Sequence, residues 1–406
     1  MMGVRPRYRA SLGSDPATGR LKVACLLLFF CAACGPSGGT QISQSGAGAF
    51  DASLASTDDG FAVAWYDRRD GNAEIYLRLL NAMGEPAGPE RRLTSSPELS
   101  YTADIQPAGT NVAVAWYEEA GGKMQAKIGV WSPDGQLLWS NTLSSTERNG
   151  RNPILRRDGN GLMAVWIEDL PAGLANTTDR PWESEVWASW WNVEGKLLRV
   201  ARMLAPAGRT TSSLNAALDG RGWAWVMFDA RAGTKSEELF VTRTDGNASE
   251  VAMLTADDGM PSRYPDVAFS SDGRAAVTWY DERDGNQEVY LFAGRMAEFL
   301  EARAFRVTET DGHSIAPYLA WNGRRIGVAW SDDSEGQYEV YFRGFNETGA
   351  PLARATRLTD NPTASVVPAI RPSGTGFALA WNESTAVPEG GSEAAGRSEI
   401  AFTVVR

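Results

Sequence analysis

An acidic residue follows a repeated aromatic residue at a fixed distance of two positions along this chain. The aromatic anchor recurs seven times, with methionine replacing tryptophan once, as Trp65, Trp116, Trp166, Met227, Trp279, Trp330 and Trp381. The acids that follow are Asp67, Glu118, Glu168, Asp229, Asp281, Asp332 and Glu383, and arginines accompany three of them as Arg69, Arg231 and Arg283. Carboxylates and guanidinium groups at repeated positions could hold a cation or form a charged surface that binds a partner.

The segment Asp67 to Asn72 (DRRDGN) resembles a cation-binding loop in its residue types but not in its spacing. It supplies oxygen ligands of the kind that Ca²⁺ takes, yet it lacks the alternating D-x-D-x-D-G order of such loops. Asp-Gly and Gly-Asn pairs more often form tight turns, and we expect Asp67 to accept hydrogen bonds from backbone amides there. We therefore predict no metal site and no cofactor, with a bound cation as the alternative.

Signals for nucleophilic catalysis are weak. The single histidine, His313, cannot build a histidine-rich zinc site, and a Ser-His-Asp triad would have to use it. Residues 35–39 match G-x-S-x-G, but no strand precedes them, so we interpret the match as accidental. We assign no catalytic residue.

The anchors recur at steps of 51, 50, 61, 52, 51 and 51 residues, which is typical of a repeat architecture. Each repeat holds four strand signals separated by turns. In the fifth repeat they are residues 265–270, 275–280, 288–292 and 304–308. Four strands in about 50 residues predict one propeller blade. The fold class is therefore all-β, a seven-bladed β-propeller over residues 40–406.

The second strand of each repeat alternates large and small apolar residues. In the first repeat Phe61, Val63 and Trp65 share one face, while Ala62 and Ala64 share the other. Both faces are apolar, as expected for a sheet that lies between two neighbours. We expect the large face of one blade to pack on the small face of the next.

A second motif, an apolar residue followed by a small or hydroxyl residue, predicts how the ring closes. Its second residue lies 22 positions before the anchor in six of seven repeats, and it marks the outermost strand. The chain ends at Arg406 after a third strand, with no fourth strand behind it. Residues 40–44 carry the motif at the right distance from Trp65, so we expect them to complete the last blade and leave no open edge.

The loops between strands two and three should open on the same face as the connections between blades. The seven acids and three arginines would then surround one mouth of the central channel, as a binding surface or as solvated turn residues. The two longest of these loops, in repeats three and seven, fall on the same face, and the first contains Trp182. The aromatic strand EVWASWWN (185–192) is interpreted as core packing.

The first 33 residues differ in composition from the rest. They carry five basic residues and one acid, so the remainder of a chain of net charge −11 is close to −15. An apolar run from Val23 to Ala33, too short to span a bilayer as a helix, precedes Cys34. We expect no nucleic-acid partner, because nucleic acid requires a basic surface.

Residues 31–34 (CAAC) resemble a bacterial lipobox, in which the last cysteine is lipidated, although leucine is usual at Cys31. The resemblance implies a lipoprotein signal peptide at 1–33 and lipidation of Cys34, with an ordinary cleaved signal or an uncleaved anchor as the alternatives. The composition of the segment after Cys34 predicts a flexible tether at 34–39. Gly35 replaces the aspartate that would imply inner-membrane retention, so the outer membrane is expected.

The repeats themselves resemble two propeller families. The order SSDGR, RDGNQEVY and RVT, with RLT at residues 92–94 and 357–359, is similar to TolB-type periplasmic propellers and to bacterial sialidase-like propellers. The sialidase Asp-box S-x-D-x-G-x-T-W is absent. Of the catalytic residues that this resemblance would imply, only arginines are available in the sequence, and the others cannot be assigned. We expect a monomeric, lipid-anchored cell-envelope protein that binds a protein or glycan without catalysis. The alternative is a sialidase-like glycoside hydrolase.

Overall fold

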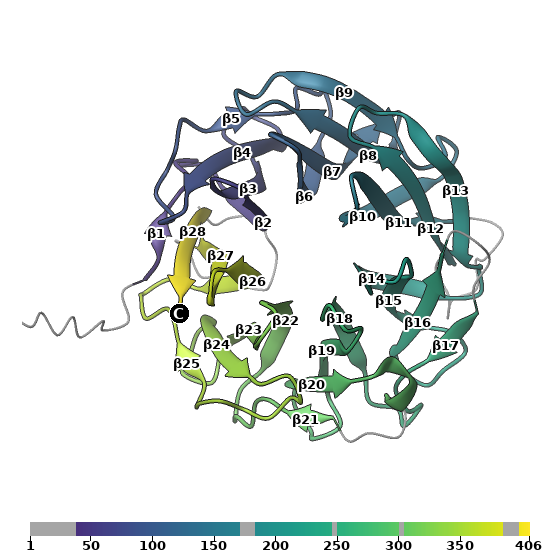
Figure 1. The fold of residues 1–406 in the computed structure, drawn as a ribbon, viewed down its shortest axis with the longest axis vertical. Coiled ribbons are helices and arrows are strands. Elements are labelled where there is room, and N and C mark those ends of the chain that lie inside the picture. Colours follow the sequence, from purple (N-terminus) through teal and green to yellow (C-terminus); the bar gives the residue numbers. More distant parts are fainter. Residues whose placement is uncertain (1–37, 171–182, 246–249, 300–303, 385–397) are drawn as a thin grey trace, which may run out of the picture. The chain divides into compact units, whose positions relative to one another are not determined.

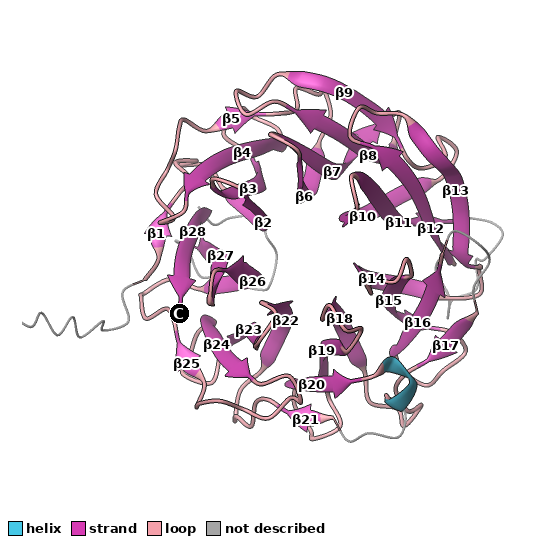
Figure 2. Cartoon of the chain, in the orientation of Figure 1, coloured by secondary structure: helices cyan, strands magenta, loops and turns pink. Residues whose placement is uncertain are grey.

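The computed structural model describes residues 38–170, 183–245, 250–299, 304–384 and 398–406. These residues form seven four-stranded antiparallel sheets around a common axis, which confirms the predicted seven-bladed β-propeller (Figure 1). In the described residues helical structure is limited to one 3₁₀ turn, η1 (Met296–Glu298), after β20 (Figure 2).

Each blade runs from an inner strand beside the axis to an outer strand at the rim. Blade one holds β2 (Ala49–Thr57), β3 (Gly60–Asp67), β4 (Glu74–Asn81) and β5 (Arg91–Arg92). Blade two holds β6 (Ser100–Ala108), β7 (Asn111–Ala120), β8 (Lys123–Trp131) and β9 (Leu137–Thr142). Blade three holds β10 (Asn149–Asp158), β11 (Gly161–Asp169), β12 (Ser184–Asn192) and β13 (Leu197–Ala205). Blade four holds β14 (Thr210–Leu218), β15 (Ala224–Arg231), β16 (Glu238–Thr244) and β17 (Val251–Met253).

The other three blades follow the same order. Blade five holds β18 (Ser262–Phe269), β19 (Ala275–Asp281), β20 (Glu288–Gly294) and β21 (Phe305–Arg306). Blade six holds β22 (Ser314–Trp321), β23 (Ile326–Asp332), β24 (Glu339–Phe345) and β25 (Thr356–Arg357). Blade seven holds β26 (Ser365–Ser373), β27 (Gly376–Ser384), β28 (Ser398–Val405) and, from the other end of the chain, β1 (Thr40–Gln41).

The blades pack large face against small face, as the alternation in their second strands predicts. The face of β3 that carries Phe61, Val63 and Trp65 packs against Ala378 and Ala380 of blade seven. The small residues on the other face of β3 receive the equivalent large positions of blade two. All six anchor tryptophans are at most 3% exposed. Loss of one such side chain typically costs about 3–5 kcal/mol of folding free energy.

Blade seven is completed by the N-terminal strand, which confirms the predicted closure. In the β1–β28 pair Thr40 lies opposite Phe402 and Gln41 lies opposite Ala401. The two strands lie side by side in the ribbon although they come from opposite ends of the described chain (Figure 1). The third strand of blade seven therefore does not leave an open edge.

Every inner strand contains a β-bulge where it pairs with the second strand of its blade. Six of the bulges hold a residue other than glycine with positive φ, namely Asp51, Thr102, Asn152, Tyr264, Ala316 and Val367. A bulge leaves one residue out of the ladder and re-aims its neighbours. The seven bulges therefore change the direction of the inner strands near one end of the channel.

Candidate functional site

The predicted acids lie inside the blades, where they hold the anchor tryptophans. Because residues two apart in a strand share a face, the carboxylate reaches the indole of the anchor. The Trp65 indole N–H donates to Asp67 at 3.0 Å, and the Trp381 indole donates to Glu383 at 2.8 Å. The same bond forms at Glu118, Glu168 and Asp281. Tryptophan followed two residues later by an acid is thus a structural signature of the blade, whereas the sequence suggested a binding role for these acids.

The remaining two acids are also held internally. Asp229, in the blade with Met227 at the anchor, accepts the Ser213 hydroxyl at 2.6 Å and the Tyr264 N–H at 3.0 Å. Asp332 accepts the Ser314 hydroxyl at 2.6 Å. None of these acids is a solvated turn residue, and Asp67 and Asp229 are completely buried.

The turn reading of the DRRDGN segment is confirmed. The Arg69 N–H donates to Asp67 Oδ1 at 2.9 Å, which closes the turn, and the Arg283 N–H donates to Asp281 at 3.0 Å in blade five. In both blades the arginine side chain also pairs with the same carboxylate. Burial alone would raise the pKa of Asp67, but hydrogen bonds from Arg69 and other donors lower it below its usual value.

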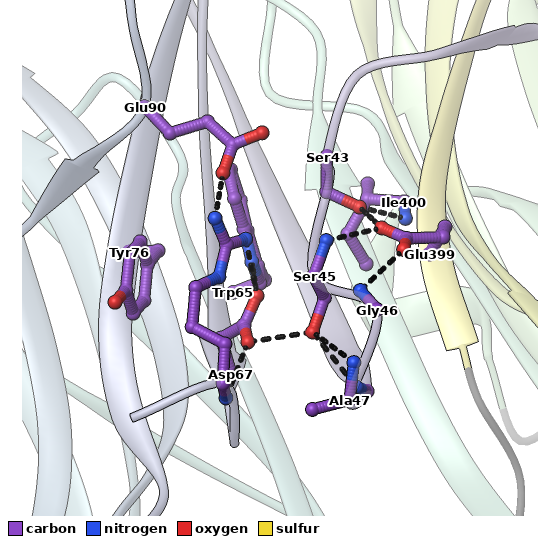
Figure 3. Close-up of polar contacts among 12 residues, drawn as sticks. Ser43, Ser45, Gly46, Ala47, Trp65, Asp67, Tyr76, Glu90, Glu399 and Ile400 are labelled. Carbon is purple, nitrogen blue, oxygen red and sulfur yellow. Dashed lines mark hydrogen bonds and ion pairs between the residues drawn. The ribbon is translucent and has the colours of Figure 1, made fainter. Parts of the chain in front are cut away.

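Asp67 also takes part in ring closure. The Ser45 hydroxyl donates to Asp67 at 2.6 Å, and the Ser45 N–H donates to Glu399 at 2.9 Å (Figure 3). Figure 3 shows the N-terminal segment between the Trp65–Asp67 pair of blade one and Glu399 of blade seven. The carboxylate of Asp67 therefore helps to hold the N-terminal segment.

A second carboxylate begins the third strand of most blades and holds the fourth strand. In blade one the Thr94 hydroxyl donates to Glu74 at 2.5 Å and accepts the Ile75 N–H at 2.9 Å, while Arg92 donates to Glu74 at 2.7 Å. The equivalent pairs are Thr255–Glu238, Thr308–Glu288, Thr359–Glu339 and Ser43–Glu399. The hydroxyl residue of the outer-strand motif therefore holds the fourth strand by its hydrogen bond to this glutamate.

A repeated amide closes the connection between blades. The Asn72 side chain donates to the carbonyl groups of Ser96 and Glu98 at 3.0 and 2.9 Å, and Asn286 does the same in blade five. The polar residues that recur in every repeat are therefore used in building the blade. A binding site has to be sought among residues that differ from blade to blade.

Such residues gather in the channel, where sequence analysis did not look. Asp104 of β6 and Asp266 of β18 occupy equivalent positions on their inner strands, and Arg156 of β10 and Arg371 of β26 lie two positions further on. Alternation places the four side chains on the same face of their strands. Arg156, Asp266 and Arg371 line one cavity that the inner strands enclose, and Asp104 pairs with Arg156 beside it. The sequence did contain a signal for these residues. They are charged at inner-strand positions where most other repeats carry a small or apolar residue.

Asp104 links several blades. Its carboxylate accepts the Leu155 N–H and the Arg156 guanidinium, each at 2.8 Å, and the Ser53 hydroxyl at 3.0 Å. Arg371, from blade seven, comes within 4.0 Å of the same carboxylate. Since Arg156 makes the close ion pair, the charge of Asp104 is already compensated.

Asp266 has no comparable ion pair. It is 5% exposed and accepts the N–H groups of Leu319 and Val267, each at 2.8 Å. Within the described parts of the chain no arginine lies within 4.0 Å of it. Burial raises the pKa of the Asp266 carboxyl, and the backbone donors and the charges of Arg156 and Arg371 offset only part of this rise.

Tyrosines line the channel at the end that faces the loops between strands two and three. Tyr264 is 46% exposed, has φ 54° and stacks on Tyr280 with the ring centroids 5.7 Å apart. Burial raises the pKa of Tyr264 and of Tyr318, and the charge of Asp229 adds to the first rise and that of Asp266 to the second.

The structure does not bring the predicted binding residues together in one cluster. Asp67 with Arg69, and Asp281 with Arg283, form pairs inside single blades, and the remaining acids lie in separate blades. Arg231 is 3.6 Å from Glu237, and its side chain is 47% exposed. Trp182, both long loops (residues 171–182 and 385–397) and Cys34 lie outside the described residues. Binding by any of these residues stays a prediction.

Two other interpretations can be compared with the structure. Trp190 and Trp191 of the aromatic strand are 3% and 8% exposed, which confirms core packing. The described residues contain no group of three or more His, Cys, Asp or Glu side chains that could hold a metal ion. In the same residues no helix has the length and apolar character needed to cross a membrane.

Known proteins resemble this chain in fold only. No protein family matches the sequence, and no curated protein is significantly similar to it. The polysaccharide lyase Uly1 superimposes with a TM-score of 0.55 at 10% identity, over 90% of this chain and 91% of the lyase. A protein of unknown function from Dyadobacter fermentans gives 0.51 at 10% identity, over 91% and 98%. A prolyl endopeptidase gives 0.53 at 15% identity over 83% of this chain, which spans 46% of that protein.

Proposed function

We propose that this chain is a lipid-anchored β-propeller of the bacterial cell envelope that acts as a binding or scaffold protein. Its partner, a protein or a glycan, would bind on the face that carries the loops between strands two and three. The observation that supports this most is Tyr264, an exposed aromatic side chain at the channel mouth on that face.

Tyr264 occupies the bulge of its inner strand, where the other blades carry smaller side chains. The positive φ is shared with the equivalent residue of five other bulges, so what distinguishes this position is the large aromatic side chain that the bulge presents. The side chains of Arg231 and Arg283, on the same face, are 47% and 39% exposed. Tyrosine and arginine are enriched among the residues that dominate binding energy at interfaces.

The anchor would hold the rim of blade seven close to the membrane. Six peptide units separate Cys34 from Thr40, the first residue of β1, and an extended chain of that length reaches about 20 Å. Lipidation of Cys34 would therefore keep the rim of blade seven near the bilayer. Gly35 in place of aspartate favours the outer membrane as that bilayer.

Site-specific crosslinking tests the proposal. A photo-crosslinking phenylalanine would replace Tyr264, and the matched control would carry it in place of Met83, which is 74% exposed in the loop between strands three and four. After irradiation of intact cells, we expect defined adducts from position 264 and none of them from position 83. The same adducts from both positions, or none from either, would contradict a partner on the proposed face.

The second candidate function is a sialidase-like glycoside hydrolase. Asp104 and Asp266 support it, because they occupy equivalent inner-strand positions in two blades and glycoside hydrolysis uses a pair of carboxyls. The similarity of the fold to a polysaccharide lyase is compatible with a glycan ligand but does not identify an activity. Turnover of a fluorogenic glycoside that is lost in both Asp104→Asn and Asp266→Asn would favour this candidate over a scaffold.

A further inference from the structure

We propose that β13, the outer strand of blade three, is a docking edge for an extended segment of a partner protein. The segment would add to blade three as a fifth strand, and its sequence would alternate acidic and apolar residues. This edge shares no residue with the channel mouth, so the inference goes beyond the proposed function and does not depend on it.

The outer strands of blades two and three are longer than those of the other blades. β9 has 6 residues and β13 has 9, whereas the outer strands of the other five blades have two or three. Both long strands follow the outer rim of the ring (Figure 1). Very short edge strands are one way in which proteins prevent their sheets from pairing with other chains. Blades two and three therefore lack a protection that the other blades have.

The outer edge of β13 is open and exposes apolar side chains. In the described residues β13 pairs only with β12, so the backbone groups along its other edge have no strand partner there. The first seven residues of β13 are exposed. Its large apolar side chains between 40% and 65% exposed are Leu197, Leu198, Val200 and Met203. A long, exposed and apolar edge strand is a template to which another chain can add.

The same strand is basic in an acidic protein. From Lys196 to Arg209 the chain carries four basic residues and no acidic residue, although its net charge is −11. Lys196 and Arg202 are exposed, and within the described residues neither side chain has an ion-pair partner. Like charges that face each other across two strands are destabilising, so a second copy of β13 is a poor partner for this edge. An acidic segment is complementary to it.

Bulges in β13 place two of its arginines on one face. The pairing with β12 gains an extra residue on β13 at three places, and Arg202 lies opposite Ala188. Arg199 lies opposite Trp190, two residues further along β12, and its guanidinium stands 5.3 Å from the centroid of the Trp190 ring. Residues two apart in a strand share a face, and opposed residues of paired strands share it as well. Both arginines are therefore on the face that carries Trp190.

The other face of β13 is apolar. Met203 lies opposite Trp187. Leu197 lies opposite Trp191, which is on the same face of β12 as Trp187. Trp139 of β9 stacks on Trp191 with the ring centroids 6.0 Å apart, so the apolar face continues toward blade two. A strand added at this edge places alternate side chains on the two faces, so its acidic residues would meet the arginines and its apolar residues would meet Leu197 and Met203.

This arrangement favours a strand over a membrane surface as the occupant. A bilayer presents one plane and would contact one face of β13, whereas the arginines and the apolar side chains stand on opposite faces. A strand at the edge contacts both faces, and it also supplies hydrogen-bond partners for the open backbone groups.

Fluorescence anisotropy with synthetic peptides of nine residues, the length of β13, tests the docking edge on the full chain in mild detergent. The probe alternates valine and glutamate. One control carries lysine in place of glutamate, a second has the same composition with valines and glutamates in pairs, and a third has N-methylated backbone amides throughout. We expect saturable binding of the probe and at least tenfold weaker binding of each control. No saturable binding of the probe, or equal affinity for any control, would overturn the proposal.

Variants locate the binding at β13. Arg202→Glu and Met203→Ser should each weaken binding of the probe at least tenfold, because they alter the two faces separately. Arg354→Glu, at an exposed position in the loop between β24 and β25, should leave the affinity unchanged. Thermal melts would verify that each variant is folded, and Lys196→Glu replaces Arg202→Glu if the latter does not fold. Unchanged affinity in the folded β13 variants would exclude this edge.

Anionic vesicles test the membrane as the occupant. Phosphatidylglycerol vesicles are sedimented with the Cys34→Ser chain, so that no lipid on Cys34 can anchor it. Vesicle binding that Arg202→Glu abolishes, without binding of the peptide probe, would assign the edge to a lipid surface and overturn the proposal. Photo-crosslinking from position 264 should persist in Arg202→Glu, so failure of one proposal does not decide the other.

Discussion

The Ser43 hydroxyl donates to Glu399 at 2.5 Å, although the two residues are 356 positions apart in the chain. The same hydroxyl accepts the Ile400 N–H at 2.7 Å, and Glu399 also accepts the N–H groups of Ser45 and Gly46 (Figure 3). Thr94 and Glu74 make the equivalent contact inside blade one. The ring is thus closed by the same hydroxyl–glutamate contact that holds the fourth strand in four other blades.

Deletion of residues 40–45 should lower the melting temperature markedly and promote aggregation. The deletion removes the β1 pairing and exposes the edge of β28. Ser43→Ala alone should cost about 1–3 kcal/mol, because it leaves the Ile400 N–H and Glu399 short of a partner. Ser95→Ala, at an exposed position, serves as the control in thermal denaturation. A deletion variant that melts with the parent would refute the role of closure in stability.

Two anchor tryptophans should respond differently to replacement by phenylalanine. The Trp279 indole donates to Asp281 at 3.1 Å, whereas the Trp330 nitrogen is buried without a partner in the described structure. Trp279→Phe should therefore destabilise the protein by about 1–3 kcal/mol more than Trp330→Phe, because it leaves a buried carboxylate short of a donor. Chemical denaturation of the two variants measures the difference. Equal losses would mean that the indole bond contributes nothing.

Acid should destabilise the protein partly through Asp281. Burial would raise its pKa, but hydrogen bonds from Arg283 and Ser262 lower it below the ordinary value of 3.8. A depressed carboxyl pKa contributes stability that is present above that value and is lost as the pH falls through the folded-state pKa. Asp281→Asn should therefore be less stable than the parent at pH 7, and the gap should narrow below about pH 4. Asp58→Asn, in an exposed turn, controls for the loss of one charge.

Asp266→Asn should have the opposite effect on stability. Burial raises the pKa of Asp266, so folding with the carboxyl ionised is unfavourable and the parent loses stability as the pH rises through the range between the two pKa values. The asparagine can still accept the Leu319 N–H. We expect a higher melting temperature at pH 7 and no gain below about pH 4. A variant that is less stable at pH 7 would show that the ionised carboxylate is fully compensated.

Cys34→Ser should release the protein from membranes. Lipidation requires the cysteine thiol, and two acyl signals or more are needed for stable membrane association of a soluble domain. Fractionation of cells that express the parent and the variant measures the change, with Cys31→Ser as the matched control. Retention of Cys34→Ser in the membrane fraction would contradict lipidation at this position.

Much of the fold could be predicted from local patterns. The spacing of Trp65 and its equivalents, the alternation on both faces of each second strand and the Leu93-Thr94 type of motif all repeat within about 50 residues. Local strand period and turn chemistry decide these features, and a repeat leaves few ways to bury both faces of each sheet. Closure by residues 40–44 could be predicted as well, because these residues carry the outer-strand motif at the same distance from Trp65 as in the other repeats.

The candidate site was less predictable, because a polar residue that recurs in each repeat can serve either the structure of the blade or a binding surface. Asp67 and Glu383 were expected on a binding face, but the tertiary structure turns their carboxylates toward Trp65 and Trp381. In the sequence, a buried carboxylate and an exposed one look the same.

The number of blades, the strands within them and the way the ends meet follow from short-range periodicity, so they could be predicted from the amino-acid sequence. Asp104, Arg156, Asp266 and Arg371 come from four separate blades, and the folded ring brings them together at one channel. The proximity of these side chains depends on how seven sheets are placed around an axis. No spacing along the chain encodes that arrangement, because the residues that meet are separated by whole blades.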